Sequence, residues 1–568
     1  MNVLGLNYYF HDSTACIVRD GNLIAAVEDE RLSRNKHSRD FPALSTAKCL
    51  ELAGIDYADV DHIAVSIKPT HNWFRRSLYA AGRPKYFWPI FKHEAAHACQ
   101  RQASFWAWFK RHWPKRGNRP QVHFIPHHMT HAPGSFYVSP YDEAALLGLD
   151  GSGEWATTFL GYGQGNRITN LGESFFPHSL GSFYEAATQF CGFRTNYDEG
   201  KTMGLAPMGD PEVFRNQVEK ILSVTDEGQV QIDLSYFRFQ NMDWRRCSQK
   251  FFDTFGPARK PGEPFEPHHE HLAAAFQRVL EDCALKICEI LHTKTKSKNL
   301  IVSGGVALNS VMNGRILRES SFDSLYVMPA AGDNGTAIGA AYYLINGILG
   351  QPRTFVHSDP YIGTEYNNDQ IRHVLNEAKA SFSEESDICR SVTDLLVEGK
   401  IVGWFQGKME IGPRSLGGRS ILANPAFPEM KDKINAEVKF REAYRPFAPS
   451  ATLEDSNQFF DNTCETPFML KVCNVLEDKR EVIPAVTHVD GSARLQTVTE
   501  ASNPRYHRLI KTFGERTGVP VVLNTSFNVQ GEPLVESPRD AIRCYFSTGL
   551  DALAIGDFLL VKDRCPQS

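Results

Sequence analysis

Two histidines four positions apart are the first residues in the sequence that could do chemistry. His127 and His131 occur in the stretch HHMTH. On a helix, residues at this spacing share one face, where two imidazoles can hold a small cation, although the spacing alone equally fits two unrelated histidines. A protease of the H-E-x-x-H type is excluded, because His128 stands where its glutamate would be.

Two aspartates could complete this site. Asp150 ends the apolar run 145–149, and Asp333 lies in the loop Gly332-Asp333-Asn334-Gly335. In a duplicated α/β fold, both loops would open on the same cleft. Two imidazoles and two carboxylates suit a divalent transition metal with open coordination positions. The two aspartates therefore shift the interpretation toward one metal site made by His127, His131, Asp150 and Asp333, with unrelated histidines as the alternative.

Basic loops dominate the last 200 or so residues. Segments 410–420 and 488–494 combine arginine with glycines and small polar residues, segment 439–447 adds Lys439, Arg441 and Arg445, and segment 524–528 adds small polar side chains after a predicted strand. Glycine lets the backbone approach a ligand, and arginine binds phosphate bidentately. Any one arginine is equally consistent with a surface ion pair. Taken together, the segments favour an anion pocket for a nucleotide and a small phosphorylated substrate.

A further anion-binding signal lies in the first half of the chain. The apolar run 300–302 leads into Gly304 and Gly305 and then into an expected helix with Asn309 in its first turn. Backbone N–H groups at such a helix start can bind a phosphate. The alternative is a tight turn between a strand and a helix, which Gly-Gly alone also favours.

The elements around these residues follow one pattern twice. Apolar runs 3–6, 15–18 and 23–28 are separated by a polar turn and by Asp20-Gly21, a strong hairpin signal. The pattern returns at 145–149 and 156–162, followed by a turn at 164–166. We therefore expect a duplicated α/β unit, which is the plan of the actin-like ATPase fold.

The pattern weakens between residues 346 and 368, where glycines and prolines predict a domain boundary.

One insertion, 73–120, contains eleven Lys or Arg residues, one acidic residue and many aromatic residues. It fits either a basic aromatic surface for an acidic or lipid-like acceptor, or a helical subdomain with an aromatic core and solvated cations.

Composition excludes several functional classes. The chain has 568 residues and a formal net charge of −5, so it is not a nucleic-acid binder by bulk electrostatics. No apolar run is long enough to span a membrane, and the start MNVLGLNYYFHDS lacks the features of a signal peptide. The 12 cysteines contain no C-x-x-C pair and fit buried thiols in a reducing cytoplasm.

Motifs along almost the whole chain resemble those of the NodU/CmcH-type O-carbamoyltransferase family. They run in order from residue 3 to about residue 556: FHDS at 10–13, HHMTH at 127–131, DEGKTMGLA at 198–206, GDNG at 332–335, EIGPRSLG at 410–417, RPFAP at 445–449, THVDGSAR at 487–494 and LNTSFN at 523–528. The resemblance implies an actin-like (ASKHA, RNase H-like) carbamoyl-transfer domain at 1–350, with the insertion 73–120. It also implies a YrdC-like α/β domain at 365–568 that forms carbamoyl-adenylate.

The family's reaction has two steps. Carbamoyl phosphate and ATP give carbamoyl-adenylate with release of pyrophosphate and phosphate. A hydroxyl of a small-molecule acceptor then attacks the carbamoyl carbon, and AMP leaves. The resemblance implies iron(II) at the four predicted ligands and Mg²⁺ with ATP. The acceptor would be an alcohol in the biosynthesis of a natural product such as an antibiotic or toxin, and a homodimer is one expected assembly.

The remaining site residues are assigned by matching motifs. The adenylate is expected near Lys201, Gly304, Gly305 and Asn309. Carbamoyl phosphate and ATP are expected near Arg414, Lys439, Arg445, Arg494, Asn524 and Asn528. His11 and Asp12 lie where the acceptor hydroxyl is expected. Because an alcohol is a poor nucleophile, it needs a base within hydrogen-bond reach, and His11 either is that base or only positions the acceptor.

Three other functions share parts of this organisation. Threonylcarbamoylation of tRNA would use both domain types, but the net acidic charge argues against it. A non-catalytic actin-like ATPase scaffold leaves the second domain unexplained. A hydrogenase-maturation carbamoyltransferase would be expected to carry an acylphosphatase domain and cysteine zinc fingers, which the sequence lacks.

Overall fold

The computed structural model describes residues 1–8, 10–113, 119–461 and 465–562, leaving out the side chains of 93–98 and 101. The chain divides into two units, one of residues 1–29 and 37–357 and one of residues 30–36 and 358–568. The boundary after residue 357 lies in the stretch where the sequence predicts one. The segment 30–36, which includes most of α1 (Asp29–Ser33), instead belongs to the second unit. The predicted domain 1–350 therefore loses this short segment.

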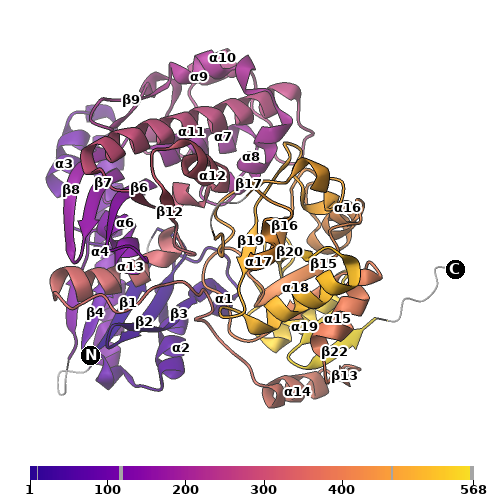
Figure 1. The fold of residues 1–568 in the computed structure, drawn as a ribbon. Coiled ribbons are helices and arrows are strands. Elements are labelled where there is room, and N and C mark those ends of the chain that lie inside the picture. The colour runs from indigo at the N-terminus through magenta and orange to yellow at the C-terminus, as the bar shows by residue number, and fades with distance from the viewer. Residues whose placement is uncertain (9, 114–118, 462–464, 563–568) are drawn as a thin grey trace. The chain divides into compact units, whose positions relative to one another are not determined.

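The first unit contains two five-stranded sheets with the same plan (Figure 1). In each sheet, three strands form an antiparallel meander, and two later strands add in parallel on the other side of its first strand. The first sheet has the order β3-β2-β1-β4-β5, with β1 (Asn2–Asn7), β2 (Thr14–Arg19), β3 (Asn22–Glu28), β4 (His62–Val65) and β5 (Gln121–Phe124). The second has the order β8-β7-β6-β11-β12, with β6 (Glu143–Gly153), β7 (Ala156–Gln164), β8 (Arg167–Phe175), β11 (Asn299–Ser303) and β12 (Ser324–Tyr326). The α/β class is confirmed, and the repeated sheet is the duplication that the sequence predicts.

Local sequence explains the meander of the first sheet. Asp20 and Gly21 both have positive φ, at 49° and 82°, as a two-residue turn between twisted antiparallel strands requires. The β1 and β2 side chains are almost all buried, as expected when both faces of a sheet are covered.

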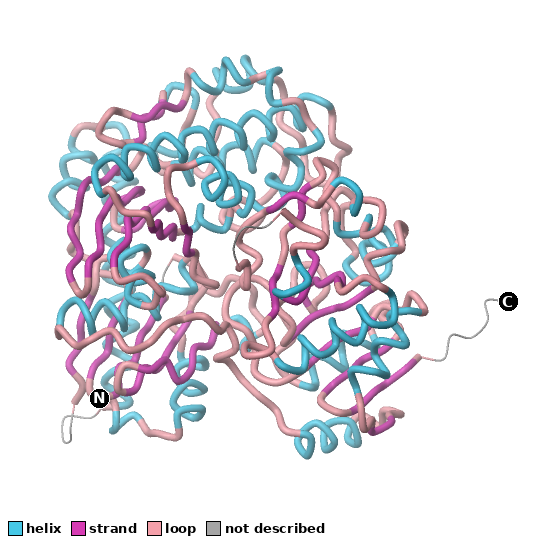
Figure 2. Tube along the Cα trace, viewed as in Figure 1, coloured by secondary structure: helices cyan, strands magenta, loops and turns pink. Residues whose placement is uncertain are grey.

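Helices connect the strands of each sheet. In the first copy these are α2 (Ala43–Ala53), α3 (Trp73–Ala81) and α4 (Phe87–His112); α5 (His127–Thr130) and α6 (Ala132–Tyr137) follow β5. In the second copy they are α7 (Leu180–Phe190), α8 (Glu199–Leu205), α9 (Arg215–Glu219), α10 (Gln249–Phe255), α11 (Pro267–Thr295) and α12 (Ser310–Glu319), with α13 (Thr336–Tyr342) after β12. A small hairpin, β9 (Leu222–Val224) and β10 (Val230–Ile232), lies between α9 and α10, and α11 packs along α7, α9 and α12 (Figures 1 and 2).

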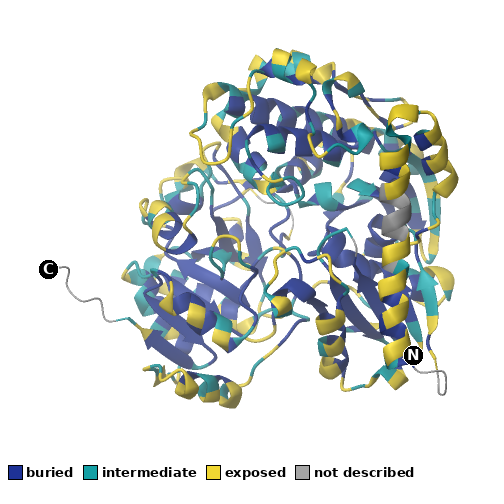
Figure 3. Ribbon diagram, turned by 180° about the vertical axis from the view of Figure 1, so that it is seen from behind, coloured by how far each residue is buried: buried dark blue, intermediate teal, exposed yellow. Residues whose placement is uncertain are grey.

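The predicted insertion is an enlarged crossover. Helices α3 and α4 connect β4 to β5, where the second copy has only α12. Phe105 and Trp113 are buried, which supports the interpretation of an aromatic core. Phe74 and Trp88 are 75% and 71% exposed, so part of the aromatic surface faces solvent. Much of the long helix is coloured as exposed in Figure 3.

The second unit is built on one eight-stranded sheet of the order β13-β22-β21-β14-β15-β20-β16-β19. Its strands are β13 (Ser383–Glu384), β14 (Val402–Phe405), β15 (Arg419–Ala423), β16 (Ala448–Thr452), β19 (Gln496–Val498), β20 (Val521–Ser526), β21 (Ala552–Ile555) and β22 (Phe558–Val561). A separate pair joins β17 (Cys473–Asn474) to β18 (Ser492–Ala493). The helices are α14 (Asn368–Glu377), α15 (Ile388–Val397), α16 (Met430–Ile434), α17 (Leu453–Ser456), α18 (Pro504–Thr517) and α19 (Pro538–Phe546).

Two apolar clusters form the core of this second unit. One includes Phe405, Leu523 and Phe558, and the other includes Trp404, Tyr506 and Phe513. Phe405 and Trp404 are neighbours on β14 and belong to different clusters, because successive side chains of a strand point to opposite faces of the sheet.

Candidate metal centre and anion pocket

The four predicted metal ligands meet in the interior of the first unit. The Nε2 atoms of His127 and His131 are 2.9 Å apart. Asp333 Oδ1 lies 3.4 Å and 3.5 Å from these two nitrogens, and Asp150 Oδ2 lies 3.6 Å and 3.9 Å from them. Four ligands placed about 2.1 Å from one ion in a tetrahedron are about 3.4 Å from one another. The donor set therefore fits one divalent cation, and it is buried.

The local backbone differs from the single helix expected at this site. Helix α5 has only four residues, and His131 is the non-helical residue between α5 and α6. Pro133 at the start of α6 favours this break, because proline fits the first turn of a helix but not its interior. The break still leaves both imidazoles on one side, with their ring planes at 87° and their centroids 4.5 Å apart.

Backbone groups hold the ligands in position. The carbonyl oxygen of Ser66 lies 3.3 Å from Nδ1 of His127, which leaves Nε2 for a metal. The carboxylate of Glu154 accepts hydrogen bonds from the backbone N–H groups of His127 and Lys68. Gly339 of α13 packs so closely on Thr130 that an added Cβ atom would overlap the carbonyl oxygen of Thr130. The small-residue helix predicted at 336–341 thus fixes α5.

The charges of the four side chains favour a bound cation. Burial alone would lower the pKa of His127, but the carboxylates of Asp333 and Asp150 outweigh it and raise this pKa well above its usual value. Burial alone would raise the pKa of Asp333, and the imidazoles of His11 and His127 instead keep it well below its usual value. Opposite charges are therefore strongly coupled in a place with little solvent, which is typical of a functional site.

His11 and Asp12 lie beside this cluster. His11 Nε2 is 3.9 Å from Asp333 Oδ2, and its Nδ1 is 2.9 Å from Asp12 Oδ2. Asp12 Oδ1 in turn contacts Nδ1 of His37 at 2.7 Å. Asp12 has a φ of 56°, an uncommon conformation for a residue other than glycine. These contacts form a polar chain from His37 to the metal ligands, and His37 is a member that the sequence analysis missed.

The electrostatics of His11 depend on the same carboxylates. Burial alone would lower the pKa of His11, but Asp333 and Asp12 outweigh burial and raise it to about 10. A cation held by Asp333 would offset part of the negative charge that causes this rise. A cation bound by the four ligands would therefore lower the pKa of His11 from this raised value.

The glycine turn of β11 supports the metal site. The backbone N–H of Gly305 donates to Asp150 Oδ1 at 3.1 Å. Gly304 has a φ of 98°, and a Cβ atom there would overlap the carbonyl oxygen of Leu149. Asn309 caps α12 through Met312 and exchanges hydrogen bonds with Gln277. Lys201 forms an ion pair with Asp198 at 3.3 Å. Of these four predicted adenylate residues, Gly305 directly contacts a metal ligand.

In the second unit, arginines gather with few acids nearby. Burial and then Arg445 lower the pKa of Arg414 to about 10, and burial and then Arg445 lower that of Arg441 to about 9. Burial, Arg414, Arg441 and Arg445 lower the pKa of Arg494 well below its usual value. Its Nε atom is buried without a hydrogen-bond partner in the described part of the chain. Such mutual repulsion favours binding of an anion.

The other predicted residues of this pocket have protein partners. The Nζ of Lys439 donates to the backbone oxygens and side chains of Ser526 and Asn528. The side chain of Asn524 contacts Ser415, Ser450 and Gln496 and is buried. Both residues therefore hold the end of β20 in place in this structure. Arg441 belongs to the cation cluster, although the sequence analysis did not single it out from its segment.

Comparisons with known proteins agree with this division. The carbamoyltransferase N-terminus family model matches residues 2–342, and the carbamoyltransferase C-terminus model matches residues 393–562. An uncharacterized Synechocystis protein is 38% identical, covering 100% of this chain and 97% of its own. Nodulation protein NolNO of Sinorhizobium fredii is 36% identical, covering 98% and 80%. The 3'-hydroxymethylcephem-O-carbamoyltransferase of Streptomyces clavuligerus is 36% identical over 45% of this chain and 48% of its own.

Solved structures are more distant. A phosphate- and nucleotide-bound form of full-length HypF aligns with 60% of this chain and 55% of its own at 12% identity, with a TM-score of 0.31. Within the described ranges, each helix is too short or too polar to cross a lipid bilayer.

The two family matches together span nearly the whole chain, in the order of the two units. The chain belongs to the carbamoyltransferase family and is a transferase enzyme.

Proposed function

We propose that this enzyme transfers the carbamoyl group of carbamoyl phosphate to a hydroxyl of a small-molecule alcohol by way of carbamoyl-adenylate, at the expense of ATP. The observation that carries the proposal is the presence of two clusters that favour ligands of opposite charge. The first unit has a buried cluster of two histidines and two aspartates that could hold a cation, and the second has a cluster of arginines with depressed pKa values. The named O-carbamoyltransferase among the relatives supports the same chemistry.

The second unit would bind the two phosphorylated substrates, with Mg²⁺ accompanying ATP. We propose that it is the YrdC-like, adenylate-forming domain. Arg414, Arg445 and Arg494 would offset the negative charge of two phosphorylated molecules brought together. Because both phosphate and pyrophosphate are released, one water molecule is consumed. It cleaves the phosphate from carbamoyl phosphate, and the resulting carbamate oxygen then displaces pyrophosphate from the α-phosphorus of ATP.

Lys439, Asn524 and Asn528 would shape this pocket by holding the end of β20. The hydrogen bonds of Lys439 with Ser526 and Asn528 support this role, because the oxygens of these two residues already occupy the three N–H donors of its Nζ.

The first unit would carry out the transfer step. A cation at His127, His131, Asp150 and Asp333, proposed to be iron(II), would act as a Lewis acid on the phosphate of the adenylate. His11 would contact the acceptor hydroxyl and take its proton, and Asp12 would orient the imidazole. The proton leaves the hydroxyl as its oxygen bonds to the carbamoyl carbon, and the bond from that carbon to the AMP oxygen breaks. Gly304, Gly305, Asn309 and Lys201 would line the adenylate side of this site.

The proposed biological setting is natural-product biosynthesis in the cytoplasm. The ten described cysteines are free thiols, which fits a reducing compartment. The acceptor would be an alcohol on a small natural product.

Pyrophosphate release tests the proposal directly. Purified protein is incubated with ATP and Mg²⁺, with and without carbamoyl phosphate, and pyrophosphate and phosphate are measured. We expect both to appear only with carbamoyl phosphate, and a mass increase of one carbamoyl group on an alcohol from a panel analysed by mass spectrometry. Pyrophosphate release without carbamoyl phosphate at the same rate would contradict the proposal. Elemental analysis of the purified protein tests for iron.

A further inference from the structure

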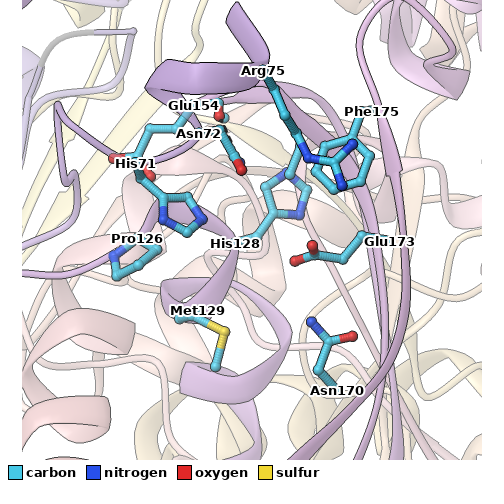
Figure 4. A pocket seen from close by; sticks show the side chains of 12 residues that line it. His71, Asn72, Arg75, Pro126, His128, Met129, Glu154, Asn170, Glu173 and Phe175 are labelled. Carbon is cyan, nitrogen blue, oxygen red and sulfur yellow. Dashed lines mark hydrogen bonds between the residues drawn. The ribbon is translucent and has the colours of Figure 1, made fainter.

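A cavity of about 270 Å³ lies in the first unit beside α5. Its walls come from the start of α3, from α5, from the turn between β6 and β7, and from β8. Figure 4 shows His71, His128 and Glu173 directed toward its centre, with Arg75 beside the ring of Phe175. His127 and His131 belong to the metal cluster, whereas His128 lines this cavity, so α5 contributes to two different sites.

His128 is the feature that points to a ligand. Its side chain is buried, at 4% exposure, and the backbone of Ala156 is its one hydrogen-bond partner among the described residues, a contact outside ordinary hydrogen-bond geometry that leaves the other ring nitrogen unsatisfied. Leaving a buried polar group unsatisfied costs about 1–3 kcal/mol. Buried polar groups in native proteins almost always have a partner, which can be a ligand or ordered water. A bound group with hydroxyls would supply both a donor and an acceptor for the ring.

The charges around the cavity favour a neutral ligand. The guanidinium of Arg75 lies 4.1 Å from the centroid of the Phe175 ring. Burial raises the pKa of the Glu173 carboxyl, and the Asn170 side chain and the Arg75 charge act against this rise. One cation is thus offset by one carboxylate. An anionic ligand would meet Glu173, and a strongly cationic one would meet Arg75.

The second carboxylate of the lining is already used by the protein. Glu154 accepts from the backbone N–H groups of Lys68 and His127, and its backbone oxygen accepts from Nδ2 of Asn72 at 3.1 Å. The wall of the cavity therefore holds the metal ligand His127 in place. A group bound here lies next to the residues that position the metal site.

We propose that this cavity binds a neutral, polyhydroxylated group of the size of a single sugar ring. The dispersed donors and acceptors of His71, Asn72 and His128, together with the apolar side chains of Pro126 and Met129 in the lining, match hydroxyl groups that alternate with C–H surface. Two sources share this chemistry: a sugar-like part of the acceptor, and a free sugar that acts as an effector. The assignment of the sugar to the acceptor rests on the proposed function, whereas the existence of the binding site does not.

Saturation-transfer difference NMR tests the site on the full chain. The probes are methyl β-D-glucopyranoside, which is neutral, D-glucosamine, which is cationic, and glucose 6-phosphate, which is anionic. We expect signals for the neutral probe and their loss in Asn170→Met, because Asn170 is an exposed lining residue and a long apolar side chain there would fill the cavity. The matched control is Arg167→Met, at an exposed position of β8 outside the lining, which should keep the signals. His128→Leu should also abolish them, with circular dichroism showing that the chain is folded.

Three outcomes would overturn the proposal. The neutral-probe signal could be lost in both Asn170→Met and Arg167→Met, or it could be retained in both Asn170→Met and His128→Leu. The third is a stronger signal for glucose 6-phosphate than for the neutral probe. Pyrophosphate release from ATP and carbamoyl phosphate is measured on the same variants and should not change, so failure of the site and failure of the proposed function are distinguishable. If the source is the acceptor, Asn170→Met raises the acceptor KM and the neutral probe competes with the acceptor. If the source is an effector, the probe changes the transfer rate without competing.

Discussion

Gly153 lies directly against the imidazole ring of His127, so that a Cβ atom added to Gly153 would overlap Cδ2 of that ring. The end of β6 thus supplies Asp150 as a ligand and, three residues later, sets the position of a second ligand from α5. This contact connects the second sheet of the first unit to the helix that follows the first sheet. It explains why a glycine is needed at this position even though its φ is not positive.

The first prediction tests this contact. Gly153→Ala should displace His127 and lower the bound metal per chain, because overpacking at a buried site typically costs about 1–3 kcal/mol. Gly151→Ala is the matched control at the same end of β6, since its Cβ would be 3.7 Å from the nearest atom, Glu185 Oε1, an ordinary contact. Elemental analysis after equal iron(II) loading measures the difference. Equal metal content in the two variants would show that the ring of His127 does not depend on Gly153.

The second prediction separates the two reaction steps. His11→Gln should lower the rate of carbamoyl transfer by about 10²–10⁴-fold, the usual contribution of a positioned acid or base. Pyrophosphate release and metal content should be unchanged, because His11 is neither a metal ligand nor part of the second unit.

His178→Gln is the control for this substitution. His178 belongs to the same unit, accepts a hydrogen bond from the backbone N–H of Ile232 and does not contact the metal cluster. It should keep the transfer rate of the natural sequence. Transfer by His11→Gln at the rate of His178→Gln would remove His11 from the mechanism.

Local patterns in the sequence predicted the elements whose geometry depends on neighbours along the chain. The Asp20-Gly21 turn and the repeated meander are of this kind, since each is a turn or an alternation. The four metal ligands were predicted from the spacing of two histidines, from two loop aspartates and from matching motifs. The break at His131 was not predicted, because a four-residue spacing fits a continuous helix equally well.

Features that depend on distant contacts were not predictable from the sequence. Gly305 donates to Asp150 across 155 positions, and the cavity brings Arg75 next to Phe175. The segment 30–36 belongs to the second unit because the carbonyl oxygens of Gly412 and Pro533 accept from Arg31 and Arg34, hundreds of residues away. No pattern within one segment contains that information.

The third prediction concerns acid stability. Burial lowers the pKa of His357 from 6.5 to about 4. Because the folded pKa is the lower one, the unfolded chain binds a proton first as the pH falls. The stabilisation is fully present above pH 6.5 and is lost as the pH decreases toward 4. Linkage gives a loss of about 2 kcal/mol in the free energy of unfolding between pH 7 and pH 5.

Urea unfolding followed by tryptophan fluorescence measures this loss, since seven of the eight tryptophans lie in the first unit together with His357. His357→Leu should show a smaller decrease in stability between pH 7 and pH 5 than the natural sequence. His373→Leu, at a side chain that is 73% exposed, should show the full decrease. The same decrease in all three proteins would assign the acid sensitivity to other groups.

The fourth prediction follows from the repulsion among the arginines of the second unit. Arg494→Gln removes one of four neighbouring cations, so the protein without substrates should melt at a higher temperature than the natural sequence. Pyrophosphate, used as the probe, should stabilise the natural sequence by about 2.7 kcal/mol at 100 times its Kd and stabilise Arg494→Gln much less. Arg508→Gln is the matched control, because its side chain is 62% exposed and pairs with Asp387 on the surface. A structural role for Arg494 predicts the reverse, a lower melting temperature with an unchanged response to pyrophosphate. The sign of the melting shift therefore decides whether the cation cluster exists to bind anions or to hold the fold.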